Sequence, residues 1–161
     1  MKRNTFLKTA TAAAFLSVLI TPALAGVPNR EKIRLFYDAF VKQDPALLDG
    51  ILAENWEDIP PNPGQQPGRD NFKPYVAKSG QTFSNMKMTN EDIIQEGNKV
   101  VVRSTFEATN TGSFAGFPAK GNPIKIMTID IHEFNDQGLV VKTWHLEDWL
   151  GGLFQMGAFE K

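Results

Sequence analysis

Residues 144–149, with the sequence WHLEDW, collect several side chains that could move a proton. The segment holds one of the two histidines of the chain, His145, and two carboxylates, Glu147 and Asp148, between two of its three tryptophans. Imidazole and carboxylate groups are common general acids and bases. A carboxylate that loses hydration in an apolar site has a raised pKa, which suits proton transfer near neutral pH. The segment therefore predicts acid/base chemistry, provided that one of these groups faces a pocket.

Alternation along a strand divides these groups between two faces. The segment ends a predicted strand, and successive side chains of a strand point to opposite sides. Trp144, Leu146 and Asp148 then share a mainly apolar face, which is the predicted pocket face. His145 and Glu147 fall on the other face, where we expect solvent or sheet packing around them. Asp148 is thus the predicted general acid/base, and the alternative is a carboxylate that caps the following turn.

A further polar pair lies on the preceding strand. Asp130 and His132 are two residues apart, so they share a face. A two-residue hairpin turn would pair Ile129 with Trp144 and place His132 away from the pocket. A three-residue turn would pair Asp130 with Trp144 and bring His132 into the pocket. Burial of the apolar neighbours favours the first register, and a bulge would allow the second. His132 is therefore a candidate second catalytic group, with Asp130 as a candidate pocket residue.

Other catalytic classes lack support in the sequence. The chain has no cysteine, so it offers neither a thiol nucleophile nor a disulfide. It has no G-x-S-x-G sequence for a serine nucleophile and no phosphate-binding loop at a helix start. With two histidines and no cysteine, a structural zinc site is not expected, and no metal ligand is assigned. The formal net charge is −1 without any Lys/Arg run, which argues against nucleic acid as a partner.

The first 25 residues predict an export signal. A basic start precedes an uncharged apolar stretch over 12–20, and residues 23–25 (ALA) form a small-x-small cleavage sequence. The stretch is too short to span a membrane well. Cleavage would remove three positive charges and leave a domain over 26–161 with a formal charge of −4. We expect this domain in the periplasm or secreted, without membrane attachment; an uncleaved anchor is the alternative.

The mature part predicts helices first and strands after them. Apolar spacing predicts a helix over 30–43, a short helix capped by Asp44, and a third helix over 69–82. The proline-rich segment 58–68 is the expected lid. Strands are expected over 86–95, 99–109, 124–134 and 139–149. This order indicates one α+β domain, in which about three helices close a cone-shaped, curved antiparallel sheet around a small-molecule pocket.

Several aromatic side chains are expected near the mouth of this pocket. Trp56 and Asp58 lie at a helix-to-loop corner that should cover the mouth, although Trp56 would also suit a core plug. The glycine-rich loop 109–123 carries Phe114 and Phe117. These two rings are predicted to form an apolar rim of the pocket or a dimer contact.

Three segments together resemble the SnoaL-like polyketide cyclase (ester cyclase) group of the nuclear transport factor 2-like superfamily. A tryptophan precedes a proline-rich loop in ENWEDIPPNPGQQPGRDNFK, and a G-x-F-x-G-x-P sequence occupies 112–118. A strand pair ends in Trp-x-x-x-Asp at 144–148, followed by Gln-x-Gly at 155–157. The resemblance implies a conical fold and a cofactor-free enzyme that closes rings by an intramolecular aldol step. It also implies an acid/base aspartate at Asp148.

The chain departs from the family pattern at three positions. Ile59 follows Asp58, and Asn110 stands in the loop strand, where relatives often have a histidine at each position. Glu133 occupies a position where relatives often have an arginine. These differences weaken the transfer of a specific cyclase activity to this chain.

Two functions of different classes follow. The first is acid/base catalysis on a small, largely apolar carbonyl compound through Asp148, by cyclisation, isomerisation or hydration, without metal or organic cofactor. The second is a non-catalytic domain that binds a hydrophobic ligand in the periplasm. A homodimer formed through the outer face of the sheet follows the habit of the superfamily and is kept as a third interpretation.

Overall fold

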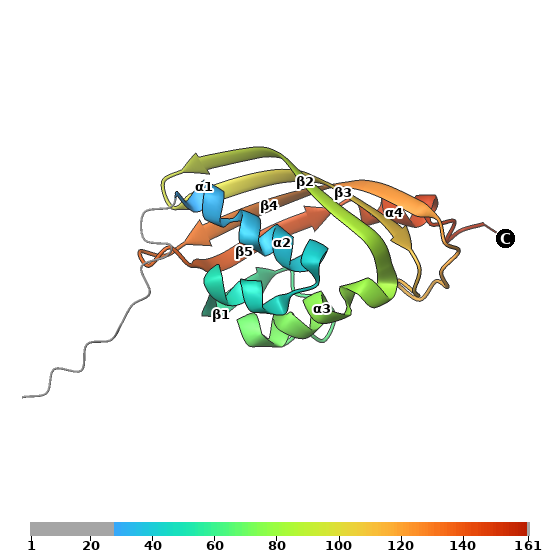
Figure 1. Ribbon diagram of the computed structural model, residues 1–161, viewed down its shortest axis with the longest axis horizontal. Helices are drawn as coiled ribbons and strands as arrows, with labels where there is room; N and C mark the ends of the chain where they lie inside the picture. The colour runs from blue at the N-terminus through green and yellow to red at the C-terminus, as the bar shows by residue number, and fades with distance from the viewer. Residues whose placement is uncertain (1–27, 161) are drawn as a thin grey trace, which may run out of the picture.

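The computed structural model describes residues 28–160, so the predicted export signal and its cleavage site lie outside the described residues. In chain order the elements are α1 (Asn29–Lys32), α2 (Arg34–Lys42), the 3-10 helix η2 (Pro45–Gly50), β1 (Leu52–Ile59), α3 (Arg69–Thr82), β2 (Phe83–Glu96), β3 (Lys99–Asn110), β4 (Pro123–Phe134), β5 (Val140–Glu147) and α4 (Trp149–Gln155). Helices α1 to α3 pass over one side of the sheet, and α4 lies near its far end (Figure 1). The α+β class is confirmed.

The five strands form one curved sheet with the order β1-β5-β4-β3-β2. Strands β2 to β5 pair antiparallel, whereas β1 pairs parallel to β5 at the edge. Strand β2 continues directly from α3 and bends strongly over the sheet (Figure 1). Its pairing with β3 shifts register between Ser84 and Lys87 and between Asn90 and Asp92. Such bulges increase local twist and bending, which explains how this edge of the sheet curves around the helices.

The N-terminal helices form where the sequence predicts them. Ile33, Phe36 and Tyr37 recur at three- and four-residue spacing and are buried against the sheet. The Asp44 carboxylate accepts a hydrogen bond from the Ala46 amide at 3.0 Å, and Pro45 begins η2. The strand β1 and the helix α4 were not expected from the sequence. Both help to form the site described below.

Burial alternates strictly along β3 and β4, so each strand has one face toward the helices and one toward the outside. The buried apolar residues form two clusters. The larger cluster joins α2, η2, α3 and β1 to the β3–β4–β5 part of the sheet, and the smaller one lies around Phe83, Phe106 and Met156. None of the helices within residues 28–160 has the length and apolar character needed to cross a bilayer.

The hairpin between β4 and β5 has neither of the two predicted registers. Ile131 pairs with Trp144, and His132 pairs with Thr143. Trp144 and His132 therefore lie on opposite faces, as in the first predicted register. The buried face, however, is that of Thr143, which is 1% exposed, whereas Leu146 is 76% exposed. The prediction that Trp144, Leu146 and Asp148 face the pocket is wrong.

The physical reason for this inversion is that the polar face of β5 has partners. Trp56, His132, Asp58 and Glu147 side chains bond to Thr143 and His145 on that face. On the outer face, the ammonium groups of two lysines, Lys99 and Lys142, lie over the Trp144 ring at 5.2 and 5.6 Å from its centroid. Apolarity along three residues of one strand was therefore a poor guide to the buried face.

Candidate functional site

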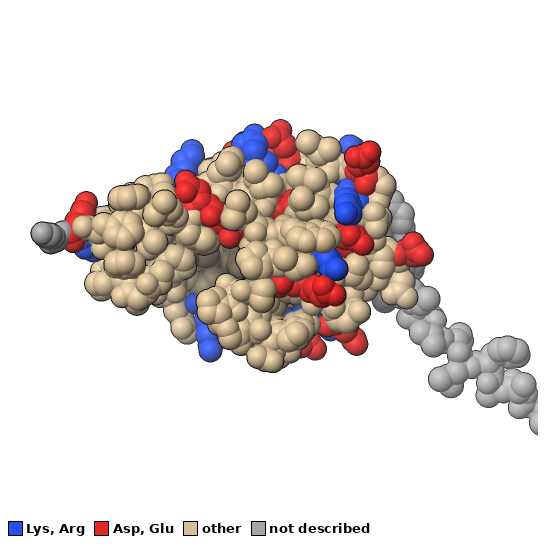
Figure 2. Space-filling view, turned by 180° about the vertical axis from the view of Figure 1, so that it is seen from behind, with Lys and Arg blue, Asp and Glu red and all other residues tan. Residues whose placement is uncertain are grey.

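A cavity of about 620 Å³ lies between α2, α3 and the inner face of the sheet. Its apolar wall consists of Phe36, Phe40, Phe72, Tyr75, Phe83, Met86, Met88, Phe106, Phe114 and Trp149. Its polar wall consists of Asp58, Thr128, Asp130, Thr143, His145 and Glu147, with Lys78, Ser79, Thr82 and Asn62 also in the lining. Seen from behind, the surface is hollowed near the middle of the molecule, and mostly uncharged residues surround the hollow (Figure 2). A mainly apolar cavity of this size with a few converging polar groups is typical of a small-molecule site.

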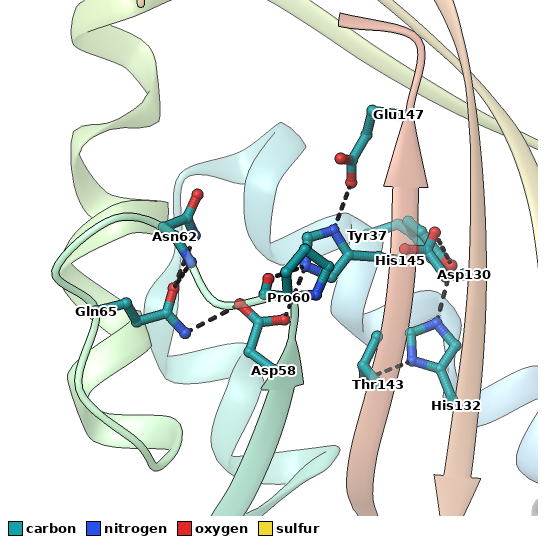
Figure 3. Close-up of polar contacts among 10 residues, drawn as sticks. All are labelled: Tyr37, Asp58, Pro60, Asn62, Gln65, Asp130, His132, Thr143, His145 and Glu147. Atoms are coloured by element: carbon teal, nitrogen blue, oxygen red, sulfur yellow. Dashed lines mark hydrogen bonds and ion pairs between the residues drawn. The ribbon is translucent and has the colours of Figure 1, made fainter.

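A buried hydrogen-bonded chain supports the polar wall from behind (Figure 3). The Tyr37 hydroxyl donates to Asp130 Oδ2 at 2.9 Å, and the Tyr37 hydroxyl oxygen lies 3.0 Å from His132 Nε2. His132 Nδ1 lies 3.0 Å from Thr143 Oγ1, which accepts a hydrogen bond from Trp56 Nε1 at 2.9 Å. Helix α2 supplies the tyrosine, and strands β4, β5 and β1 supply the other groups.

When Asp130 is ionised, only one placement of the protons gives every hydrogen bond along this buried series a donor and an acceptor. Tyr37 has a single hydroxyl proton, which it gives to Asp130, so His132 Nε2 must carry the proton that bonds back to the tyrosine oxygen. Neutral His132 then accepts at Nδ1 from Thr143, whose oxygen is free to accept from Trp56. If Asp130 gains a proton, the Asp130–Tyr37–His132–Thr143 bonds can all reverse. The chain therefore accommodates both forms of the carboxyl group.

Burial shifts the pKa values of Asp130 and His132, the two titratable groups of this buried hydrogen-bonded series, in opposite directions. Asp130 is 5% exposed, and its burial raises the pKa of the carboxyl to about 7. The Tyr37 hydrogen bond acts against this rise, and the negative charge of Glu147 adds to it. Burial lowers the pKa of His132 to about 3, with a smaller contribution from the His145 charge. At neutral pH His132 is thus an uncharged imidazole, while Asp130 is divided between its acid and base forms.

His145 is held between two carboxylates on the same wall (Figure 3). Its Nε2 lies 3.2 Å from Asp58 Oδ1 and 2.8 Å from the Pro60 carbonyl oxygen, and its Nδ1 lies 2.9 Å from Glu147 Oε1. Both ring nitrogens face acceptors, so both carry protons. The hydrogen bonds to Asp58 and Glu147 raise the pKa of His145 to about 11. The imidazolium joins β1, the following loop and β5.

The expectation that His145 and Glu147 lie in solvent or in sheet packing is wrong, because both line the cavity. Asp58 also lines it, and Gln65 in the expected lid donates to Asp58 Oδ2 at 2.9 Å. The parallel pairing of β1 with β5 places Asp58 opposite Thr143, next to His145. Without an expected strand at 52–59, sequence reasoning could not bring these groups together.

Asp148 is the N-cap of α4. Its Oδ1 accepts a hydrogen bond from the Gly151 amide at 2.9 Å, and the side chain is exposed and absent from the cavity lining. The alternative of a capping carboxylate is therefore the observed one, since Ser, Thr, Asp and Asn stabilise the free amides at a helix start. A glycine at 151 accommodates the cap, because a Cβ there would lie 2.3 Å from Asp148 Oδ2.

The remaining candidates divide between cavity, core and surface. Trp56 is fully buried as a core plug behind the cavity wall, where it bonds to Thr143 and packs on Phe72 with 4.8 Å between ring centroids. Phe114 lines the cavity and packs on Trp149 with 4.6 Å between ring centroids. Phe117 is not a rim residue of this cavity; it packs on Phe159 instead. Trp144 and Leu146 lie outside, as described above. His132 lies behind the cavity wall, in contact with Tyr37 rather than in the lining.

Sequence reasoning missed Tyr37, Thr128 and Thr143 as site residues. In the sequence, Tyr37 belongs to the apolar spacing of the helix predicted over 30–43. A phenol on a buried helix face requires a hydrogen-bond partner, and this is the one signal that could have marked it. Thr128 and Thr143 carry no signal in the sequence beyond a polar residue in a buried row. Within residues 28–160, no group of three His, Cys, Asp or Glu side chains has the arrangement of a metal site.

Known proteins share this architecture. The family model of the SnoaL-like polyketide cyclases matches residues 31–156. A comparison with curated proteins gives no match. Among solved structures, TsrD from Streptomyces laurentii is 30% identical over 80% of this chain and 94% of its own, with a TM-score of 0.74.

Two further structures extend the likeness. IdmH from Streptomyces antibioticus is 25% identical over 80% of this chain and 98% of its own, with a TM-score of 0.68. A SnoaL-like polyketide cyclase from Agrobacterium tumefaciens strain C58 is 16% identical over 80% and 98%, with a TM-score of 0.67, and supports the fold alone. Because the family model covers most of the chain, this protein belongs to the SnoaL-like polyketide cyclase family.

Proposed function

We propose that this protein binds a small, largely apolar carbonyl compound and moves a proton to and from it through Asp130. Family membership supports a ligand-binding or cyclase-type function. The observation that carries the proposal is the Asp130 carboxyl group, which lines a mainly apolar cavity and has a pKa raised to about 7. A general acid or base is most effective when its pKa lies near the working pH.

Asp130 has an oxygen available for this work. Its Oδ2 accepts from Tyr37, and Oδ1 accepts no hydrogen bond from the other residues of the 28–160 range. In the base form, Oδ1 would take a proton from the carbon beside the substrate carbonyl, leaving an enolate. The resulting acid form would return the proton to carbon or oxygen at a later step. Ring closure by an aldol step and isomerisation both use this pair of transfers, and in hydration the proton that Asp130 takes would come from water instead of carbon.

Tyr37 and His132 would position Asp130 rather than react themselves. Neutral His132 holds the tyrosine oxygen from behind, so the phenol points its proton at the carboxylate. His145, with both nitrogens engaged, would supply a fixed positive charge on the wall where an enolate forms. Reversal of the buried chain would let Asp130 change its protonation state without breaking these contacts. The buried proton chain thus supports an enzyme more strongly than a passive binding domain.

Deuterium exchange tests this proposal without knowledge of the natural substrate. The probe is 2-tetralone, an apolar ketone with acidic protons beside the carbonyl, in D₂O. We expect the wild-type protein to accelerate its exchange above the buffer rate, and Asp130→Asn to lower the rate by about 100-fold or more. The matched control is Asp148→Asn, which keeps an N-cap residue and should retain the wild-type rate. Binding of 2-tetralone without accelerated exchange would support the non-catalytic binding function instead.

We further propose that residues 1–25 direct export and are removed. The support is the basic start, the apolar stretch and the ALA sequence at 23–25. N-terminal sequencing of the protein from a host periplasm or medium should then begin at Gly26. A retained N-terminus would contradict this proposal.

A homodimer through the outer face of the sheet is also proposed. Four large apolar side chains on β4, β5 and α4 are exposed on or beside this face: Met127, Ile129, Leu146 and Leu150. Ile129 lies opposite Leu146 on the neighbouring strand, and exposed apolar side chains that group together are typical of an association site.

A further inference from the structure

Thr128 differs from the other buried residues of the polar wall because its side chain has no hydrogen-bond partner. Its side chain is 5% exposed and lines the cavity, and its Oγ1 is the one buried side-chain polar atom between residues 28 and 160 that lacks a hydrogen-bond partner. Buried polar groups in native proteins are nearly always paired, so an unpaired hydroxyl in a cavity wall needs an explanation.

The neighbours of Thr128 do not supply that partner. Ser104 is opposite it on β3, and its hydroxyl accepts from Asn90 Nδ2 at 2.9 Å. Glu147 is opposite it on β5, and its Oε1 is taken by His145 at 2.9 Å. Neither side chain bonds to Thr128, although both lie on adjacent strands. The hydroxyl therefore keeps both its proton and its oxygen for another molecule.

When Asp130 is ionised, the other polar groups on the sheet side of the cavity lack a free proton to give. Tyr37 donates to Asp130, Thr143 is bonded by Trp56 and His132, and both nitrogens of His145 face oxygen acceptors. Among the groups on the sheet side of the cavity, Thr128 alone combines burial with an uncommitted O–H donor.

The position of Thr128 relative to Asp130 suits one reaction geometry. The two residues are two apart on β4 and share the cavity face, so their Cα atoms are about 6.8 Å apart. A carbonyl oxygen in reach of the hydroxyl would place the neighbouring C–H carbon toward the carboxylate. We propose that the Thr128 hydroxyl donates a hydrogen bond to the carbonyl oxygen of the substrate while Asp130 acts on the adjacent carbon. The identity of the reacting group rests on the proposed function above.

This arrangement makes Thr128 a specificity determinant for an oxygen acceptor. When the adjacent carbon loses its proton to Asp130, negative charge develops on the carbonyl oxygen, and the hydroxyl donor bonds more strongly to that charge. Thr128 would therefore contribute to ligand binding and further to the rate. An apolar ligand of the same shape but without the oxygen would leave the hydroxyl unpaired.

Paired probes separate this inference from the proposed function. The probes are 2-tetralone and 2-methylenetetralin, in which a CH₂ group replaces the carbonyl oxygen. The Kd of each is measured by NMR titration with the full domain. We expect Thr128→Val, which removes the hydroxyl at constant shape, to shift the ratio of the two Kd values about 3- to 10-fold toward the hydrocarbon. Thr128→Ser should keep the wild-type ratio, and Thr89→Val is the control for a Thr-to-Val change outside the cavity.

The possible outcomes are distinct. A Kd ratio that is unchanged in Thr128→Val overturns the inference and leaves Asp130 catalysis standing. A ratio that shifts in Thr128→Val but not in Thr89→Val supports it, even if wild-type protein shows no deuterium exchange, in which case only the proposed catalysis fails. Asp130→Asn, which should lose exchange, should keep the ketone preference, because the hydroxyl donor remains.

Discussion

At the scale of single residues, two aspartates show how surroundings decide what one functional group can do. Asp148 follows a strand and caps a helix in solvent, whereas Asp130 lies in the cavity wall with a tyrosine hydroxyl as partner. Burial raises the pKa of Asp130 to about 7. The same carboxyl group is therefore a local stabiliser at one position and a candidate acid/base at the other.

The capping role of Asp148 predicts a loss of stability without loss of activity. Asp148→Ala removes the acceptor for the Gly151 amide and should lower the free energy of unfolding by about 1 kcal/mol. Asp148→Asn should change it by much less, since asparagine caps nearly as well. Urea denaturation of both variants measures this. A loss of deuterium exchange in folded Asp148→Asn would show instead that the carboxylate acts in the chemistry.

The phenol of Tyr37 predicts a shift in pH dependence. Its hydrogen bond lowers the pKa of Asp130, against the larger effect of burial. In Tyr37→Phe the pKa of Asp130 should therefore rise, and the midpoint of the exchange-rate profile should move upward from about 7. The control is Tyr75→Phe, a second tyrosine of the cavity lining, which should leave the midpoint in place. Equal profiles for wild type and Tyr37→Phe would rule out the positioning role.

At the scale of elements, the site depends on a strand that the sequence did not reveal. The sequence predicts the end of a helix and a corner over 52–59, because Leu52 continues the apolar side of the short helix that follows Asp44. As β1 it pairs parallel to β5 and brings Asp58 to His145. In contrast, the apolar spacing of α2 and the cap at Asp44 are local features, and the sequence predicted both elements.

The ion cluster that joins β1 to β5 predicts pH-dependent stability. The folded pKa of His145 is raised to about 11 from an ordinary value near 6.5. Its contribution is therefore fully present below pH ~6.5 and is lost as the pH rises toward 11. His145→Gln should lower the free energy of unfolding by about 2–3 kcal/mol at pH 6 and by less at pH 9. Denaturation at both pH values measures this, and a difference independent of pH would contradict it.

At the scale of the whole molecule, the fold class was more predictable from the sequence than the buried face of each strand. The predicted order of helices before strands indicates an α+β domain with one curved sheet, and this class is correct, although β1 precedes α3 and α4 follows the last strand. The face of β5 depends on what packs against it from α2, β1 and β4, which are distant in sequence. A one-residue shift reverses every side chain of a strand, so local apolarity could not identify the cavity face.

The inversion leaves apolar side chains on the outside of the sheet, and this predicts self-association. Leu146 is 76% exposed and Met127 is 50% exposed. If the proposed dimer forms here, Leu146→Lys should convert it to monomer in sedimentation velocity experiments. Leu146→Met is the matched control and should remain dimeric. A monomeric wild-type protein at all accessible concentrations would contradict the dimer and leave the cavity chemistry unaffected.

The proposed proton transfer depends most directly on the proton affinity of Asp130. Side-chain ¹³C labelling of aspartate, with Asp130→Asn to assign the resonance, allows its carboxyl carbon to be titrated by NMR in the intact domain. We predict a midpoint near 7, well above the ordinary value of about 4 for an aspartate in water. A midpoint near 4 for Asp130 itself would contradict the proposed acid/base role, because the carboxyl group would then be a fixed anion at neutral pH.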